Sequence, residues 1–447
     1  MGGYGLETIN QKLFECRDVI QAIRHYDLSD KSRLSEFSGL SWPTVNTQLG
    51  ILEQQNIIKK IDREKEHDRE PTYVLNEGLT HFIGIAIGSK QIKLLIVNFR
   101  FKCIEWDSLF CNNNSSEHNI SEDTMNKYAS LKENSNSDES SKECLCFNSP
   151  NDTVSLGRDV NQLLEFIKLL RQDGVPISGI GLSFTGAVDS ANRIVIGSIG
   201  KSYIRDLSLE DLVANETLNF FKGHNIPICF EHNAKATAIA EKEYLYFDEN
   251  KKPANTKNMA AIYFGTGIVA GLIMNNTLYR GASNFGGDIG HIAAPEFSGG
   301  KKKEVERCVC GADNCLQHRF EEYGLQECIN GKSAIDENTS SAFEFYLGYI
   351  IEMLSSILNL ELIIISGKLA QKEWGTWNII NLLKEKIVLP YIAKDIQIRK
   401  SNIKGPPAAI GAAINSYYTL VNSGNPKKQG SIDCDTTISW LDVQDNY

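Results

Sequence analysis

The sequence predicts an α/β protein in which a small winged helix-turn-helix unit precedes a larger two-lobed domain. Three observations support this prediction. Residues 10 to 77 read as short amphipathic helices closed by a hairpin. Two β-rich runs, FIGIAIGSKQIKLLIVNF and MAAIYFGTGIVAGLIMNNTLYRG, repeat one hairpin pattern about 180 residues apart. Helix-like segments alternate with strands between and after these runs, which favours two related α/β halves.

The N-terminal unit, residues 1–78, is expected to begin with helices and to end with a hairpin. A helix in INQKLFECRDVIQAIRHY places four apolar residues near one face: Leu13, Val19, Ile20 and Ile23. A later helix is expected to begin at Ser41 after a turn at Gly39, and Pro43 fits its first turn, where a missing N–H costs little. The inward face of that helix carries Val45, Leu49 and Leu52.

The outward face of the same helix is polar near its N-terminus, the position from which a recognition helix reaches base edges. The candidate DNA contacts are Ser41, Thr44, Asn46, Thr47 and Gln48. IIKKI and PTYVLN flank a charged loop as the strands of a wing, so we predict a domain that binds a double-stranded DNA operator. Residues 1–80 hold 10 Lys/Arg and 13 Asp/Glu, a net charge of −3, which leaves a packing or dimerisation module as the alternative.

The larger predicted domain covers residues 79–422. Helices are expected in DVNQLLEFIKLLRQ, FEFYLGYIIEMLSSILN and GPPAAIGAAINSYY, and strands in ISGIGLSF and LELIIISG. Residues 111–152 contain nine Asn and nine Ser, too polar a composition to order by burying apolar surface. We therefore expect an inserted surface loop there and a flexible tail over residues 423–447.

Composition is ordinary for a soluble globular protein. No run of about 18 apolar residues could span a bilayer, and the first residues lack the pattern of a secretory signal, so a cytoplasmic protein without membrane contact is expected. The net charge of −10 gives no global attraction to nucleic acid, so any DNA contact must be local. Eleven cysteines, an odd number without an export signal, favour reduced thiols.

The sharpest chemical signal is GGDIGH followed by RCVCGADNC. His291, Cys308, Cys310 and Cys315 supply one imidazole and three thiolates, a ligand set suited to a closed tetrahedral structural zinc site. Gly311 permits the tight turn between the cysteines. The alternative is three free thiols in a loop.

The order of these motifs resembles the ROK family (repressors, open reading frames and sugar kinases). The winged helix is followed by GLSFTGAVD, FEHNAKATAIAE, FGTGIVAG, GGDIGH, CVCGADNCLQ and GAAI, so the resemblance covers nearly the whole chain. It implies an actin-like, sugar-kinase-type ATPase fold with two lobes. Members with an N-terminal winged helix resemble transcriptional regulators that use the kinase-like part as a sugar sensor.

Two departures from the family pattern fall on carboxylates needed for phosphoryl transfer. The resemblance places Ala86 where family kinases carry the Asp of Gly-Ile-Asp-Ile-Gly-Gly-Thr, and a hard cation thereby loses an anchor. It places Asn233 where they carry the catalytic Asp, and an amide cannot deprotonate a sugar hydroxyl. We therefore predict no catalytic residue, no enzymatic activity and no role for ATP or Mg²⁺.

The candidate ligand-binding residues are His232, Asn233, Asp288, His291 and Gln317. Asp288 and Gln317 stand where the family usually has Glu, so a hydroxyl-rich ligand remains possible with a different fit. His232 is expected to line the pocket or to be structural. Gly265, Thr266 and Gly267 form a remnant of a phosphate loop, which as a hairpin turn needs no ligand.

The sequence thus predicts a repressor of carbohydrate genes with an idle kinase-like domain that senses a sugar or derivative. A homo-oligomer, dimer or tetramer, would place recognition helices on half-sites roughly 34 Å apart. One alternative is an atypical sugar kinase with His232 as its base. Another is a protein-interaction module that binds neither sugar nor DNA.

Overall fold

The computed structural model describes residues 11–25, 30–61, 71–110, 120–136, 141–198, 201–245, 256–329, 332–334, 336–370, 396–424, 438 and 440. The chain divides into two compact units, of which the first is residues 1–255 with 408–447 and the second is residues 256–407. Each unit contains one five-stranded sheet.

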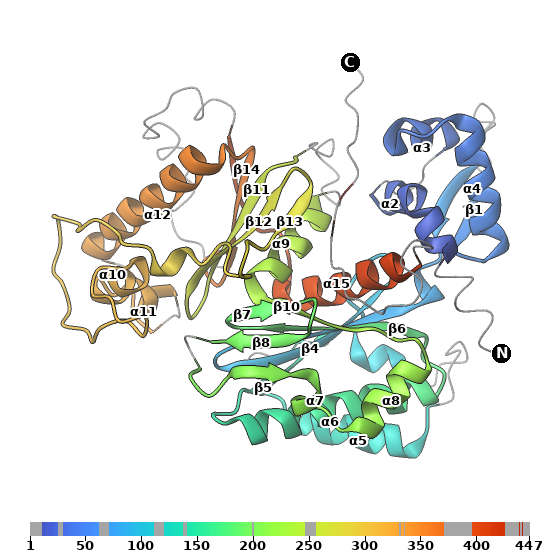
Figure 1. The fold of residues 1–447 in the computed structure, drawn as a ribbon, viewed down its shortest axis with the longest axis horizontal. Helices are drawn as coiled ribbons and strands as arrows, with labels where there is room; N and C mark the ends of the chain where they lie inside the picture. The colour runs from blue at the N-terminus through green and yellow to red at the C-terminus, as the bar shows by residue number, and fades with distance from the viewer. Residues whose placement is uncertain are drawn as a thin grey trace. The chain divides into compact units, whose positions relative to one another are not determined.

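The first unit opens with the predicted winged helix, drawn in blue in Figure 1. Its helices are α2 (Arg17–His25), α3 (Lys31–Ser38) and α4 (Trp42–Gln54), and its wing strands β1 (Ile58–Ile61) and β2 (Thr72–Leu75) pair antiparallel. Gly39 takes a left-handed φ of 67° after α3, and Ser41 caps α4 by accepting from the backbone N–H of Thr44. The charged loop between the wing strands, residues 62–70, lies outside the described residues.

The sheet of the first unit has the order β10-β6-β3-β4-β5. Its strands are β3 (His81–Ile87), β4 (Gln91–Asn98), β5 (Cys144–Asn148), β6 (Ile177–Phe184) and β10 (Ile228–His232). One face packs against α6 (Thr153–Gln172) and α8 (Asn215–Gly223), and the other carries α9 (Asn233–Tyr244) and α15 (Pro407–Ser423) (Figure 1). Alternation in β3 explains this sandwich, because Ile83, Ile85 and Ile87 join the α6 core while Gly84 meets α15.

Smaller elements complete the first unit. They are 3₁₀ helices η1 (Glu77–Leu79) and η2 (Trp106–Leu109), helices α5 (Glu122–Glu133) and α7 (Leu209–Leu212), and the sheet β7 (Ala187–Asp189), β8 (Ile194–Gly197) and β9 (Arg205–Ser208).

The second unit repeats the strand arrangement of the first. Its order is β15-β14-β11-β12-β13, from β11 (Met259–Phe264), β12 (Ile268–Met274), β13 (Thr277–Tyr279), β14 (Leu362–Gly367) and β15 (Gln397–Lys400). In both sheets two parallel pairings are followed by two antiparallel ones. The prediction of two related halves, made from the repeated hairpins, is thus confirmed.

The helices among the described residues of the second unit are α10 (Leu316–Glu322), α11 (Leu325–Ile329) and α12 (Glu337–Leu358), with a 3₁₀ turn η4 (Ile289–His291). Among the described residues α12 alone is long and apolar enough to cross a membrane. That is weak evidence, because the core helix of a soluble protein meets the same criterion, and Tyr346, Leu347 and Ile350 are buried in the core.

The interpretation of residues 111–152 as a loop is wrong for two segments. Helix α5 is capped by Ser121, and β5 pairs with β4 as the edge strand of the first sheet. The short apolar run CLCF forms this strand although its surroundings are rich in Asn and Ser. The tail is also packed at two residues, since Ile438 and Trp440 are buried.

Candidate functional site

The elbow at Asn233 lies where β10 ends and α9 begins. Nδ2 of Asn233 is 3.2 Å from the carbonyl oxygen of Ile87 and 3.1 Å from the hydroxyl of Thr185. The carbonyl of Ile87 can only accept, which fixes the amide nitrogen toward it. Oδ1 of Asn233 is buried and has no hydrogen-bond partner among the described residues. The elbow therefore holds an oriented acceptor that suits a hydroxyl donor.

His232 caps α9. Its Nδ1 lies 3.2 Å from the backbone nitrogen of Ala234 and accepts that N–H, one of those that the first turn leaves unpaired. Burial of the ring and the positive charge of Lys235 lower the pKa of His232 to about 3. A ring whose Nδ1 is engaged and whose pKa is this low is a poor general base, so the geometry disfavours the kinase alternative.

Acid is expected to destabilise the protein through His232. The ordinary pKa is 6.5 and the folded value is about 3, so between these pH values the unfolded chain binds more protons and the folded state loses stability as pH falls. The slope for one such proton is at most about 1.4 kcal/mol per pH unit. Asn also caps helices, so His232→Asn should melt with a weaker dependence on pH between 6.5 and 3 than the wild type. Equal slopes in thermal melts of both proteins would contradict this.

The first hairpin supplies no carboxylate at the predicted position. Ala86 is buried in β3, between Lys93 of β4 and Ser183 of β6 in the sheet register. Ser183 donates its hydroxyl hydrogen to the carbonyl of Ala408 at 3.3 Å.

The Gly265-Thr266-Gly267 turn is occupied by its own contacts. The Gly265 N–H donates to the carbonyl of Gly267 at 3.1 Å, and the side-chain amide of Gln326 donates to the carbonyl of Gly265. The aromatic ring of Tyr263 also lies against Gly265. The turn itself therefore uses the N–H of Gly265, one of the backbone donors of the predicted phosphate-loop remnant.

The remaining predicted ligand residues lie in the second unit. Asp288 precedes η4 and His291 ends it. Gln317 is buried in α10, donates to Glu321 at 3.0 Å, and has no partner for its Oε1 among the described residues. Gln317 also lies beside Gly267. The second unit thus places a buried amide acceptor next to the glycine turn.

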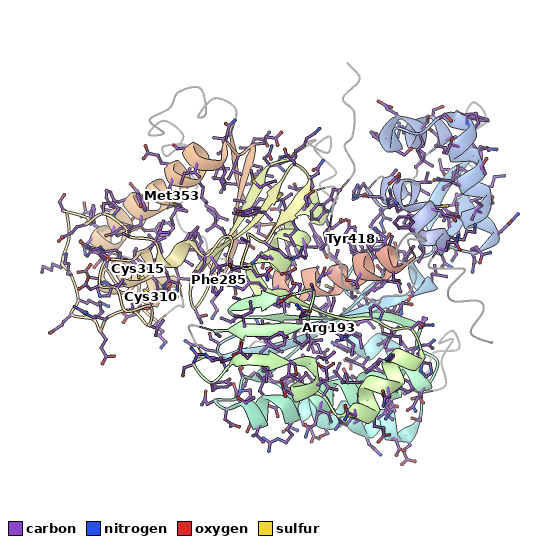
Figure 2. The ribbon with its side chains drawn as sticks, viewed as in Figure 1. Arg193, Phe285, Cys310, Cys315, Met353 and Tyr418 are labelled. Carbon is purple, nitrogen blue, oxygen red and sulfur yellow. The ribbon has the colours of Figure 1, made fainter. Side chains whose placement is uncertain are left out.

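The four predicted metal ligands come together. The ligand atoms of His291, Cys308, Cys310 and Cys315 all lie within 4.8 Å of one another. Nδ1 of His291 is 3.6 Å from Sγ of Cys308, and the Sγ atoms of Cys310 and Cys315 are 3.8 Å apart. A tetrahedral zinc ion with Zn–S bonds of about 2.3 Å separates its sulfurs by about 3.8 Å. Figure 2 labels Cys310 and Cys315, which lie in the segment that leads into α10.

The loop is built to hold that geometry. Gly311 has a φ of 87°, and its N–H donates to the carbonyl of Cys308 at 2.7 Å. Cys315 caps α10 through its sulfur and pairs as a β-bridge with Ala293, which follows His291 closely. These contacts bring the cysteine loop to the histidine, and the cluster could hold a metal ion.

The predicted DNA contacts lie at the start of α4. Ser41, Thr44, Asn46 and Thr47 are exposed, as is Trp42, and Val45 and Leu49 are buried as expected. Oδ1 of Asn46 accepts from Lys31 at 2.6 Å. Gln48 differs from its companions, because its amide nitrogen donates to the carbonyl of Glu15 at 3.0 Å and its Oε1 is buried.

Sequence reasoning did not identify Ile87 and Thr185 as the groups that orient Asn233. Ile87 ends β3 and Thr185 follows β6, both of which were predicted as strands. The ends of neighbouring parallel strands meet at one sheet edge, which was the available signal. It also missed His25 and Glu243, which form a contact between residues 218 positions apart.

Comparison with known proteins gives a consistent result. The model of the ROK family matches residues 129–416. A xylose repressor of Bacillus spizizenii is 24% identical over 424 residues, which cover 91% of this chain and 94% of that protein. A glucokinase of Halalkalibacterium halodurans is 24% identical over 280 residues, covering 55% of this chain and 79% of the glucokinase.

Among solved structures, a ROK family transcriptional regulator described as a homologue of the E. coli MLC protein aligns with a TM-score of 0.60 at 16% identity. The match covers 93% of this chain and 97% of that one. A ROK family glucokinase of Streptomyces griseus, solved with glucose and AMPPNP, aligns with a TM-score of 0.50 at 16% identity. The match covers 98% of the glucokinase chain but only 75% of this chain. At these identities the structural matches establish the fold.

Proposed function

Because the chain belongs to the ROK family, we propose that it is a sugar-responsive, DNA-binding repressor whose kinase-like fold senses its ligand without phosphorylating it. One observation carries the proposal: a winged helix with an exposed polar recognition face is joined to a kinase-like fold whose elbow presents Asn233 in place of a carboxylate. Relatives that align over nine-tenths of the chain are named xylose repressors. Such a protein acts in the cytoplasm, as a homo-oligomer on a two-fold operator.

The sugar contact of this proposal lies in the first unit, where Oδ1 of Asn233 accepts from a sugar hydroxyl. A buried acceptor without a donor is costly, so a hydroxyl that reaches Asn233 gains a full hydrogen bond. D-xylose is the first ligand to test.

Zinc is the metal that best fits the four-residue cluster. Three thiolates and one imidazole at tetrahedral spacing match a closed structural site, in which the ion stabilises the loop and takes no part in chemistry. His291 then serves the metal through Nδ1, the nitrogen that faces Cys308.

The test is gel-shift and footprinting of the full chain on its own upstream DNA, at low and at physiological salt, with and without D-xylose and MgATP. We expect a protected site whose affinity changes with the sugar, and no phosphorylated sugar. Absence of a protected site at low salt, where phosphate contacts are strongest, would exclude the regulator. Phosphorylated xylose would favour the kinase alternative, and protein partners without DNA or sugar binding would favour the interaction module.

Asn46→Ala should weaken operator binding by about 1–3 kcal/mol, roughly 5-fold to 150-fold, because Asn reads adenine through both atoms of its amide. Asn46 is exposed near the start of α4, and the hydrogen bond from Lys31 orients its amide. Glu53→Gln, at an exposed position near the end of the same helix, is the control and should not weaken binding. Equal losses for both variants in a binding titration would place the DNA contact elsewhere.

A further inference from the structure

A buried carboxylate joins four segments of the first unit that are distant in sequence. Glu243 is the last residue but one of α9 and is fully buried. Its Oε2 lies 3.3 Å from Nε2 of His25, the last residue of α2 in the winged helix. Its Oε1 accepts from the indole N–H of Trp440 at 2.6 Å and from the hydroxyl of Tyr418 on α15. Figure 2 labels Tyr418 on that helix.

The neighbouring Arg24 strengthens this junction. Its guanidinium lies 4.0 Å from the ring centre of Phe101 and 4.3 Å from that of Tyr417, and Nε donates to the carbonyl of Phe99 at 3.4 Å. The two terminal nitrogens are buried without a hydrogen-bond acceptor among the described residues. The positive charge of Arg24 acts on Glu243 through space and lowers the pKa of that carboxyl group.

The charge states at the junction follow from these contacts. Burial opposes ionisation of Glu243, but the hydrogen bond from His25 and the charges around it lower its pKa to about 2. Burial also lowers the pKa of His25 below 6.5, more than Glu243 raises it. At neutral pH a neutral His25 donates to an ionised Glu243, and the link is a charge-assisted hydrogen bond.

Helix α9 connects this junction to the elbow. It starts at Asn233 and reaches Glu243 about 15 Å further along. Every residue from Ala234 to Glu243 is buried, and the backbone of Gly411 on α15 touches the backbone of Ala236. A helix that is enclosed along its length transmits a shift at one end to the other, because packed elements move as rigid bodies.

We propose that Glu243 positions the winged helix through His25, and that α9 carries the effect of a sugar bound at Asn233 to the DNA-binding helices. The second clause rests on the proposed function, whereas the first depends only on the junction. A buried ionised carboxylate that loses a hydrogen-bond donor is strongly destabilised, so separating His25 from Glu243 is costly.

The positioning is tested by amide hydrogen exchange of the full chain carrying His25→Ala. We expect exchange in Arg17–His25 to become at least about ten-fold faster, while α6 keeps its protection. Gln21→Ala, at a buried polar position one turn earlier on α2, is the matched control and should leave exchange near the wild-type rate. Trp440→Phe, which removes one donor and keeps a ring against Tyr418, should give a smaller change of the same kind. Unchanged exchange in His25→Ala, or an equal change in Gln21→Ala, would overturn the proposal.

The coupling is tested on the same variants by operator titrations with and without D-xylose. In His25→Ala the ratio of the two operator affinities should fall toward one, while calorimetry shows a D-xylose affinity within about two-fold of the wild type. A wild-type ratio retained in His25→Ala would overturn the relay. If the wild-type chain binds neither operator nor D-xylose, the proposed function fails, and the exchange measurements still decide whether Glu243 positions the winged helix.

Discussion

Replacing Cys308 with Ser is expected to abolish stoichiometric zinc binding and to lower the stability of the second unit by about 3 kcal/mol or more. A neutral hydroxyl is a poor substitute for a thiolate at a tetrahedral zinc site. Cys308 is buried, and serine keeps the backbone carbonyl that closes the turn at Gly311, so the expected loss of stability comes from the lost metal ion. Because the second unit spans 152 residues, the melting temperature should fall by roughly 6–12 °C.

Metal analysis and thermal melts with and without a chelator check this expectation. Cys328→Ser is the matched control, since Cys328 is a buried thiol of the same unit outside the cluster, and its contacts with Ser333 and Ala334 suit a hydroxyl. The control should keep one zinc per chain and its sensitivity to chelation. A Cys308→Ser protein that melts with the wild type and retains zinc would show that the four residues do not form the metal site.

The elements that were predicted well are those whose signal is local. Ser41 and Gly39 mark the ends of neighbouring helices through the backbone conformations that they favour, and the structure shows both. The cysteine cluster could be predicted because the spacing of its residues, with Gly311 between them, nearly determines the loop. Composition misled where it was averaged over a long segment, because four of the five residues of β5 form a short apolar run within polar surroundings.

The parts that could not be predicted depend on contacts across the fold. No periodicity of apolar residues indicates that His25 contacts Glu243. None indicates that Trp440, in a polar C-terminal segment of the sequence, donates a hydrogen bond to the same carboxylate. The capping role of His232 depends on the angle at which β10 enters α9, which the sequence specifies only through the packing of both elements. The sequence therefore indicated candidate residues by their type, while the orientation of their side-chain groups required the structure.

Gly411→Ala should destabilise the first unit by about 3 kcal/mol or more. A Cβ at Gly411 would overlap the carbonyl group of Ala236 on α9, and both partners are helix backbone that no side-chain rotation can move aside. Helix α15 is held equally closely on its sheet side, where Gly84 meets Ala409 and Gly181 meets Ala412. Moving α15 away from α9 would break this close packing of α15 against the sheet. The added methyl group must therefore force apart two helices that are each held in place.

The control for Gly411→Ala is Gly50→Ala, in the interior of α4, where a Cβ meets nothing within 4 Å. Alanine favours the helix by up to about 1 kcal/mol, so this variant should unfold at slightly higher urea than the wild type. Since α9 begins at Asn233, a Gly411→Ala protein that still folds should also bind D-xylose more weakly, whereas Gly50→Ala should not. A Gly411→Ala protein with the urea midpoint and xylose affinity of the wild type would mean that α9 and α15 can part without cost, and the rigid path from the elbow to Glu243 would lose its basis.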